Sequence, residues 1–391
     1  MDKNSKIYIA GHRGLVGSEI LNELQQQGYT NLIYKTHNEL DLINQKAVNE
    51  FFEQEKPDYV FYSAAFVGGF IKQKKYPAEF LYNNITMQNN VIWAAANNGV
   101  KKLIYLASAC VFPKDAPLPL EERYMLKGAF QPNNESYAIG KVAGIKLCEY
   151  LNLEKGMNFL CVAPTSIYGE NDNFDIEDSH VQAGIFRKIY LAKMRNENNI
   201  NALCKDLNLN QKEALEFCDK HGIFDNHIKM IGTGAAAREF ANSRDLAGFC
   251  IYLAQNIDFK DLCEYDEKDN LISSFVNFTD GEPVSIKELS FLIAKLMDYK
   301  GELIFEKELS RDDGTLRKTM SRKKFNKLGY QNKISLEKGL QTMINSYSMR
   351  GGVESKYLQL KFAFLYNIIL KYNLLTLLLF YKTYKSLEGE K

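Results

Sequence analysis

Short unbroken apolar runs alternate, over the first part of the chain, with longer stretches in which apolar residues recur every three or four positions. The runs are typical of strands buried on both faces, and the longer period is typical of amphipathic helices. The runs predict strands at residues 6–10, 31–35, 59–63, 102–107 and 159–163. The periodic stretches predict helices at residues 15–27, 45–55, 77–98 and 137–155. This alternation predicts an α/β fold, a doubly wound parallel sheet covered by helices on both faces.

The regular alternation weakens after about residue 164, which predicts a second, smaller region. We expect a first domain at residues 1–170, with its sheet completed by later segments, and a smaller C-terminal substrate-binding region at residues 171–345. Segments expected in this region, interleaved with the sheet domain, are 179–194, 243–255, 273–278 and 285–297. Residues 196–229, rich in Asn, Asp, Glu, Lys and Leu, predict a helical insertion. It is either a surface helix pair or a contributor to substrate specificity.

Residues 346–391 predict an apolar helical extension, and residues 357–385 are its most apolar part. Lys361 and Lys371 interrupt this part, which makes it a poor membrane-spanning helix. At the helical period its polar residues gather on one side and leave a broad apolar face. Three roles stay open: packing on the enzyme or on a second subunit, peripheral contact with a membrane surface, and membrane spanning.

Composition excludes some classes of function. The chain has 391 residues and a formal net charge of +1, so no overall field attracts nucleic acid or anionic membrane. Seven cysteines show no C-x-x-C spacing, and the five histidines form no cluster with metal-ligand spacing. The N-terminus leads directly into a strand-like run without a signal peptide. We therefore expect a cytoplasmic protein with free thiols and no metal.

A glycine loop separates the first predicted strand from the first predicted helix. Its pattern is G-x-x-G-x-x-G, in which the first glycine allows a tight turn, the second lets backbone approach a pyrophosphate, and the third allows close helix–strand packing. The following helix N-terminus favours phosphate. The loop predicts a Rossmann-type dinucleotide site. Its candidate residues are Gly11, His12, Arg13, Gly14, Leu15, Val16 and Gly17.

The choice of coenzyme depends on the end of the second predicted strand. An acidic residue there favours NAD, and basic residues favour NADP. Here Lys35-Thr36-His37-Asn38 contains no acid, and Arg13 can also reach a ribose phosphate. The sequence therefore favours NADP(H). The candidate contacts in this segment are His37, Asn38, Glu39, Leu40, Asp41 and Leu42.

Tyr137 and Lys141 form a Y-x-x-x-K pair on a predicted helix. Residues four apart lie on one helix face. An ammonium group near a phenol stabilises the phenolate, so we expect the pKa of Tyr137 to fall. Tyr137 is thus a candidate proton donor for a ketone undergoing reduction.

With these residues the chain resembles the extended short-chain dehydrogenase/reductase family and, within it, the GDP-L-fucose synthases, epimerase-reductases of GDP-4-keto-6-deoxymannose. The resemblance covers about residues 5–345 and excludes the insertion and the tail. The motifs that carry it lie at residues 11–17, 64–69, 108–113, 134–141, 164–169, 179–181, 238–240 and 313–318.

The resemblance implies roles for residues in these motifs. Ser108, Tyr137 and Lys141 would form the reductase triad, and Cys110 and His180 the acid–base pair that inverts carbons next to the ketone. Further contacts with the coenzyme would come from Leu106, Ala107, Ser108, Ala109, Lys141, Pro164, Thr165, Ser166, Ile167 and His180. The GDP-sugar would contact Lys188, Ile231, Arg238, Asp313 and Lys318. Such enzymes often dimerise through helices equivalent to 77–98 and 137–155, which predicts a homodimer.

Departures from the family pattern keep alternatives open. Ile231 stands where the family often has tryptophan, and His37 stands where it often has arginine. These changes suggest a related substrate, such as a GDP-6-deoxy-4-keto-heptose, which is reduced at carbon 4 without epimerisation. A second alternative is a non-catalytic nucleotide-binding scaffold; the intact Ser108, Tyr137 and Lys141 set argues against it.

Overall fold

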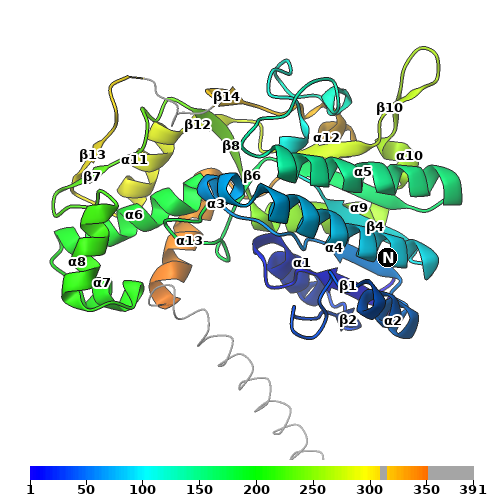
Figure 1. Ribbon diagram of the computed structural model, residues 1–391, viewed down its shortest axis with the longest axis horizontal. Helices are drawn as coiled ribbons and strands as arrows, with labels where there is room; N and C mark the ends of the chain where they lie inside the picture. The colour runs from blue at the N-terminus through cyan, green and yellow to red at the C-terminus, as the bar shows by residue number, and fades with distance from the viewer. Residues whose placement is uncertain (309–314, 351–391) are drawn as a thin grey trace, which may run out of the picture.

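The computed structural model describes residues 1–308 and 315–350. Two regions lie side by side, a sheet domain and a smaller region built mainly from the later part of the chain (Figure 1). Asp313, predicted as a substrate contact, and residues 351–391 of the predicted tail lie outside the described residues. Within the described part, no helix is both long enough and apolar enough to cross a membrane.

The sheet domain is built on six parallel strands in the order β11-β5-β4-β3-β1-β2. The strands are β1 (Ile7–Ala10), β2 (Leu32–Ile33), β3 (Tyr59–Tyr62), β4 (Lys102–Leu106), β5 (Phe159–Pro164) and β11 (Phe275–Phe278). Most of their side chains are buried because helices cover both faces of the sheet. The predicted fold class is confirmed, although β2 is shorter than the predicted strand at 31–35.

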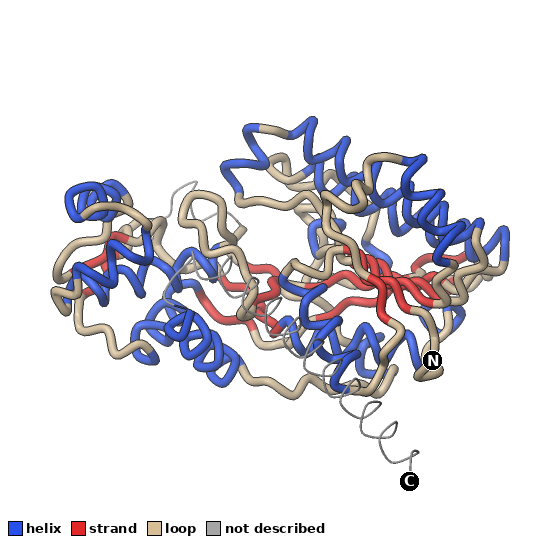
Figure 2. Tube along the Cα trace, turned by 90° about the horizontal axis from the view of Figure 1, so that it is seen from below, coloured by secondary structure: helices blue, strands red, loops and turns tan. Residues whose placement is uncertain are grey.

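Helices cover the two faces of the sheet, as the view along its edge shows (Figure 2). On one face α1 (Leu15–Gln26) packs against α9 (Ser243–Asn256). On the other lie α2 (Gln45–Glu55), α4 (Pro77–Asn97) and α5 (Glu135–Lys155). Thus α9 and the edge strand β11, although late in the sequence, belong to the sheet domain and not to the smaller region.

The smaller region has its own hydrophobic core. Its helices are α6 (Val181–Asn196), α7 (Ile200–Leu207), α8 (Gln211–Lys220), α11 (Ile286–Leu296) and α13 (Leu336–Arg350). Its strands are β7 (His227–Lys229), β13 (Glu302–Ile304), β12 (Pro283–Ser285), β8 (Ala237–Asn242), β14 (Arg317–Lys318) and β6 (Ser166–Tyr168), which pairs with β8. The predicted insertion forms α7 and α8. Asn199 and Asn210 cap these helices at their N-termini.

Shorter elements connect the two regions or lie at their margins. They are α3 (Phe70–Lys75), α10 (Phe259–Leu262), α12 (Lys323–Lys327), the hairpin of β9 (Glu264–Tyr265) and β10 (Leu271–Ser273), and the 3₁₀ turns η1 (Ala109–Val111) and η2 (Glu122–Tyr124). In the sheet, β2 lies on one side of β1 and β3 lies on the other. The direction in which successive strands are added therefore reverses at β1, beside the glycine loop. Ligands of doubly wound folds bind at this reversal, outside the carboxyl ends of the strands.

Candidate functional site

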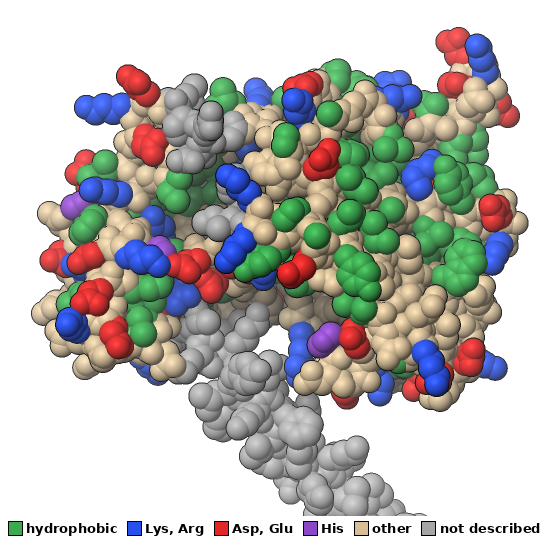
Figure 3. All heavy atoms as spheres, viewed as in Figure 1, with side chains coloured by type: hydrophobic (Ala, Val, Ile, Leu, Met, Phe, Trp, Pro, Cys, Tyr) green, Lys and Arg blue, Asp and Glu red, His purple; other side chains and the backbone are tan. Residues whose placement is uncertain are grey.

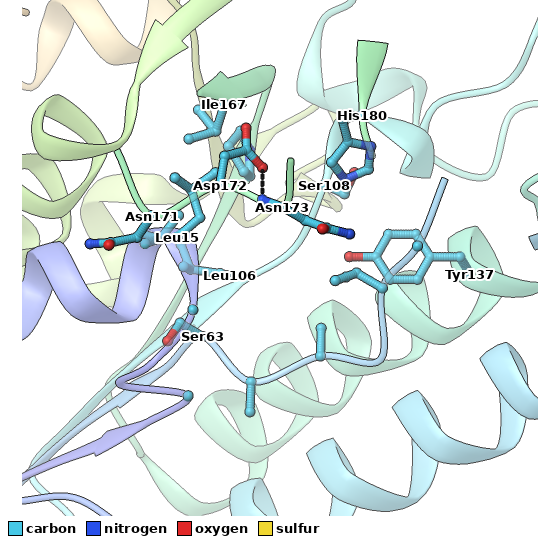
Figure 4. Close-up of a pocket in the computed structure, with 18 of the residues that line it drawn as sticks. Leu15, Ser63, Leu106, Ser108, Tyr137, Ile167, Asn171, Asp172, Asn173 and His180 are labelled. Carbon is cyan, nitrogen blue, oxygen red and sulfur yellow. Dashed lines mark hydrogen bonds between the residues drawn. The ribbon is translucent and has the colours of Figure 1, made fainter. Parts of the chain in front are cut away.

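A pocket of about 1050 Å³ lies at the reversal and extends to the smaller region. All five predicted catalytic residues line it, and Figure 4 shows Ser108, Tyr137 and His180 around one cavity, with the Tyr137 hydroxyl directed inward. The predicted coenzyme contacts that line it are Gly11, His12, Arg13, Gly14, Leu15, Val16, His37, Leu40, Leu42, Leu106, Ala107, Ser108, Ala109, Lys141, Pro164, Thr165, Ser166, Ile167 and His180. The predicted residues outside its lining are Gly17, Asn38, Glu39, Asp41, Lys188 and Ile231.

The glycine loop has the close backbone packing that a dinucleotide cradle requires. Gly11 has φ of +85°, and a Cβ on it would lie 2.7 Å from the backbone nitrogen of Ala64. A Cβ on Gly17 would lie 2.1 Å from the carbonyl oxygen of Gly11. No described side chain caps α1 at Gly14, so the N–H groups of its first turn are available to phosphate oxygens. The residues present therefore fit a bound pyrophosphate.

Basic residues surround the end of the pocket where the adenosine ribose would bind. Arg13, Lys35 and His37 line it. The Glu39 carboxylate is engaged locally: it accepts hydrogen bonds from the backbone N–H (2.7 Å) and hydroxyl (2.6 Å) of Thr36, which also lower the pKa of Glu39. Asp41 lies 3.7 Å from the His37 ring nitrogen. A ribose 2′-phosphate thus meets cations here.

Tyr137 and Lys141 lie on the pocket side of α5. The Lys141 ammonium donates a 2.8 Å hydrogen bond to the Leu106 carbonyl and lies 5.6 Å from the centre of the Tyr137 ring. Burial lowers the pKa of Lys141 to about 8. Burial also raises the pKa of Tyr137, and the nearby Cys110 thiolate adds to this effect. The expected fall in the Tyr137 pKa is therefore wrong: desolvation of the phenolate is the largest effect on this phenol.

Ser108 and Cys110 follow directly after β4. The Ser108 hydroxyl oxygen accepts a 3.3 Å hydrogen bond from the Cys110 backbone N–H and caps η1. Burial raises the pKa of the Cys110 thiol, while a hydrogen bond from Ser108 and the charges of Lys318 and Lys141 act in the opposite direction. Burial is the largest of these influences, so the pKa of the Cys110 thiol lies above its ordinary value.

His180 immediately precedes α6 and faces the pocket beside Ser108 (Figure 4). Partial removal from water lowers the pKa of His180, although the residue stays exposed at the pocket surface, and the Asp178 carboxylate partly opposes this shift. Asp178 itself accepts hydrogen bonds from the Gly69 backbone (2.9 Å) and from Lys72 (3.1 Å). The imidazole is therefore neutral at neutral pH, and the segment before it is fixed to the loop after β3.

The segment from β5 to α6 forms a further wall of the pocket and reaches α1, where Asn171 donates a 3.0 Å hydrogen bond to Ser18. Thr165 is anchored by its N–H to the Phe278 carbonyl (2.9 Å) and by its hydroxyl to the Glu239 carbonyl (3.1 Å). Pocket residues here that sequence reasoning missed are Asn171, Asp172, Asn173, Phe174 and Gln182. Figure 4 shows Asn173 between Tyr137 and His180. Asn171, Asp172 and Asn173 had a signal in the sequence, a polar run soon after the strand that ends at Tyr168.

Two cations predicted to contact the substrate meet in the pocket. The pairing of β8 with β14 sets Arg238 opposite Lys318. Desolvation lowers the pKa of both groups, and the charge of Arg238 lowers the pKa of Lys318 further. Two half-buried cations placed together in this way favour an anionic ligand. Lys188, by contrast, donates a 3.0 Å hydrogen bond to the Lys229 carbonyl outside the pocket lining, and Ile231 is 70% exposed.

Comparisons with known proteins agree with this architecture. Residues 7–263 match the model of the NAD dependent epimerase/dehydratase family. The chain is 39% identical to GDP-L-fucose synthase 1 of Arabidopsis thaliana, covering 88% of this chain and 94% of the relative. It is 36% identical to GDP-L-fucose synthase of Escherichia coli strain K12, covering 86% and 94%.

Solved structures are similar as well. A GDP-6-OMe-4-keto-L-xylo-heptose reductase from Campylobacter jejuni is 39% identical, with a TM-score of 0.85 over 90% of this chain and 99% of that one. The GDP-mannoheptose C4 reductase of the same organism, with NADP bound, is 38% identical, with a TM-score of 0.79 over 89% and 99%. The predicted resemblance is confirmed, and the chain belongs to the NAD dependent epimerase/dehydratase family, among the extended short-chain dehydrogenases/reductases.

Proposed function

We propose that this protein is an NADP(H)-dependent epimerase-reductase that converts a GDP-4-keto-6-deoxy sugar to GDP-L-fucose or a close relative. The observation that carries the proposal is the convergence of Ser108, Tyr137 and Lys141 on one pocket with a glycine cradle. The pocket also holds Cys110 and His180, the two further groups that epimerisation needs. The GDP-L-fucose synthases among the relatives support the choice of substrate.

The chain supplies separate contacts for each part of the coenzyme. NADPH, when bound, supplies a hydride to the substrate ketone. The cradle at Gly11 and the N-terminus of α1 would hold the pyrophosphate, and Arg13 and His37 the 2′-phosphate. Lys141 would contact the nicotinamide ribose. An NADP-bound relative of 38% identity supports the preference for NADP(H).

The reductive step requires a proton at the ketone oxygen. The Tyr137 phenol is protonated, because burial raises its pKa. Its hydroxyl can therefore give this proton to the oxygen while the Ser108 hydroxyl donates a second hydrogen bond. Lys141, which is 3% exposed, stabilises the phenolate that remains.

Epimerisation requires removal of a proton from a carbon next to the ketone and return of a proton to the opposite face. The ketone acidifies that C–H bond, and Ser108 and Tyr137 can stabilise the enolate oxygen. Cys110 and His180 are the candidate acid–base pair: a proton that passes from the Cys110 thiol to the His180 imidazole gives the thiolate that acts as base and the imidazolium that acts as acid. Burial is the largest influence on the Cys110 pKa and favours the thiol, while the charges of Lys318 and Lys141 reduce the cost of forming the thiolate.

The test uses the full chain, NADPH and GDP-4-keto-6-deoxymannose in heavy water. We expect NADPH oxidation together with deuterium at carbons 3 and 5 of the product, measured by absorbance and by NMR. NADPH oxidation without deuterium at these carbons would show that the enzyme reduces the ketone and does not epimerise the sugar. No oxidation with either this hexose or a GDP-4-keto-heptose would contradict the proposal.

A second candidate is a carbon-4 reductase of a GDP-6-deoxy-4-keto-heptose. The observation that favours it is the similarity to two GDP-heptose reductases, at 38% and 39% identity. Cys110→Ser separates the two functions. If the enzyme epimerises, this variant loses deuterium incorporation and forms no epimerised product; if the enzyme only reduces, turnover of the heptose is unchanged.

We further propose a homodimer formed by α4 and α5. Hydrophobic side chains gather over these helices (Figure 3). Four of them are strongly exposed: Tyr82 (63%), Trp93 (45%), Tyr150 (51%) and Leu153 (56%). Such a patch marks a protein interface. Leu153→Glu should shift the sedimentation coefficient to that of a monomer, whereas an unchanged value would rule this interface out.

We infer that the enzyme works in the cytoplasm, and its seven cysteines are unpaired. Contact of the apolar segment 357–385 with a membrane surface stays a prediction from sequence. Flotation with anionic vesicles, comparing the full chain with a chain ended at residue 350, tests it. Flotation of both forms or of neither would contradict a role for this segment.

A further inference from the structure

One residue of the helical insertion is buried beside the pocket wall. Asp206 lies on α7 and is 3% exposed. A carboxylate in such a position requires charged and hydrogen-bonding partners, because desolvation disfavours its charge. Its partners come from α6 and α13, the two helices between the insertion and the pocket. The insertion is therefore connected to the site through specific side chains.

Arg187 on α6 provides the first connection. Its Nε and one terminal nitrogen donate to Oδ1 of Asp206 at 3.2 and 3.0 Å. Its other terminal nitrogen donates to the Phe174 carbonyl at 3.1 Å. Phe174 lines the pocket and directly follows Asn173, which lies between Tyr137 and His180. Asp206 thus orients the guanidinium that holds the backbone of this wall.

Tyr347 on α13 provides the second connection. Its hydroxyl donates to Oδ2 of Asp206 at 2.8 Å, and its ring lies 4.8 Å from the Phe174 ring. Tyr347 lines the pocket and is 4% exposed. One carboxylate therefore fixes both the backbone at Phe174 and the aromatic side chain packed against it.

The α8 half of the insertion meets the same segment at the surface, where the exposed Lys220 ammonium pairs with the exposed Glu177 carboxylate at 2.8 Å. Asp219 on α8 pairs with Arg195 at 2.6 Å, and its side chain is 53% exposed. The pair Arg195–Asp225 lies in the same surface network. An exposed ion pair of this kind contributes little to stability. Within one insertion, Asp206 and Asp219 thus provide a matched pair, one carboxylate behind the pocket and one on the surface.

We propose that Asp206 is a positioning residue: through Arg187 and Tyr347 it holds the Phe174–Tyr347 wall, against which the sugar of the substrate binds. The wall belongs to the catalytic end of the pocket, and the glycine cradle lies at the other end. The contribution to sugar binding rests on the proposed function. On this proposal α7 gives the insertion a part in substrate binding, which is one of the two roles that the sequence left open, the other being a surface helix pair.

The test compares Asp206→Asn with Asp219→Asn in the full chain. Loss of charge-assisted hydrogen bonds at Asp206 should speed hydrogen exchange of the amides at 173–180 about ten-fold. The KM for GDP-4-keto-6-deoxymannose should rise by a similar factor while the KM for NADPH stays unchanged. Asp219→Asn should change neither the exchange rate of these amides nor the KM for either the sugar or NADPH. A folded Asp206→Asn variant with unchanged exchange and KM would overturn the proposal.

Tyr347→Phe is the second variant, because it retains the ring and removes one hydrogen bond. It should speed exchange at 173–180 in the same direction and raise the same KM; unchanged values would overturn the proposal even if Asp206→Asn does not fold. Exchange requires no substrate. If the wild-type protein does not oxidise NADPH with the sugar, the proposed function fails, and the exchange comparison still decides whether Asp206 braces the wall.

Discussion

The coenzyme end and the substrate end of the pocket are built in different ways. The cradle at the coenzyme end is one continuous loop, residues 11–17, whose backbone packs closely at Gly11 and Gly17. The substrate end collects side chains from β8, β14, α6 and α13, which are far apart in sequence. Backbone contacts require glycine at fixed positions. Side-chain contacts require the whole fold, because each element supplies one or two groups.

The two ends also differ in electrostatics. At the coenzyme end, polar groups are paired locally, as Glu39 is with Thr36. At the catalytic and substrate end, burial lowers the pKa of Lys141, Lys318 and Arg238 and raises the pKa of Tyr137. Buried groups whose charged forms are disfavoured are typical of catalytic and ligand-binding sites. This difference supports the proposed role of Tyr137 as the proton donor.

The largest expected effect is therefore at Tyr137. Tyr137→Phe removes the proton donor and leaves the ring packed, so NADPH oxidation with the 4-keto sugar should fall about 10²–10⁴-fold. The measurement is the initial rate of absorbance loss. NADPH affinity and the melting temperature should stay close to wild type, since the ring remains. A rate within a factor of a few of wild type would remove Tyr137 from the mechanism.

The next effect tests whether the coenzyme end depends on backbone packing. Gly11 and Gly28 have almost the same φ, +85° and +82°, but a Cβ meets the backbone of Ala64 only at Gly11. Alanine at either position costs about 1–2 kcal/mol of left-handed strain. Gly11→Ala should lower the free energy of unfolding by more than this amount, and it should also weaken NADPH binding. Urea unfolding and a fluorescence titration with NADPH measure both quantities.

Gly28→Ala is the matched control, because nothing lies within 4 Å of the added methyl group. Its free energy of unfolding should fall only by the cost of the left-handed strain, and it should bind NADPH like the wild type. Equal losses in the two variants would mean that conformation, and not close approach to Ala64, makes glycine necessary in the loop.

The difference between a local loop at one end and long-range side-chain contacts at the other explains which features could be predicted from the sequence. Strand and helix periodicity predicted the parallel sheet, and the local motifs predicted the glycine cradle and the Tyr137–Lys141 helix, because all of these depend on short-range order. The pairing of Arg238 with Lys318, and the contact of Asp206 with Tyr347, depend on β8–β14 register and on the packing of α7 against α13. No local pattern encodes such long-range contacts.

The Tyr137 pKa was predicted in the wrong direction for the same reason. Helical spacing brings Lys141 near the phenol, but it says nothing about burial. In the fold the ammonium donates to the Leu106 carbonyl and is buried, and the half-buried Tyr137 lies against the pocket. Desolvation then exceeds the attraction between them. A sequence motif can therefore identify a catalytic pair without giving its electrostatics, which follow from the surrounding packing.

The smallest expected effect measures that desolvation at Lys141. Burial lowers its pKa from 10.5 to about 8 in the folded protein. Between these two pH values the unfolded chain binds the additional proton, so this lysine makes the fold relatively more stable as pH rises from 8 toward 10.5. The Lys141→Met variant lacks the titrating ammonium group. The difference in unfolding free energy, wild type minus variant, should therefore increase between pH 7.5 and pH 9.5 in urea titrations. A difference independent of pH would show that the ammonium is not desolvated, and the contrast between the two ends of the pocket would then rest on backbone packing alone.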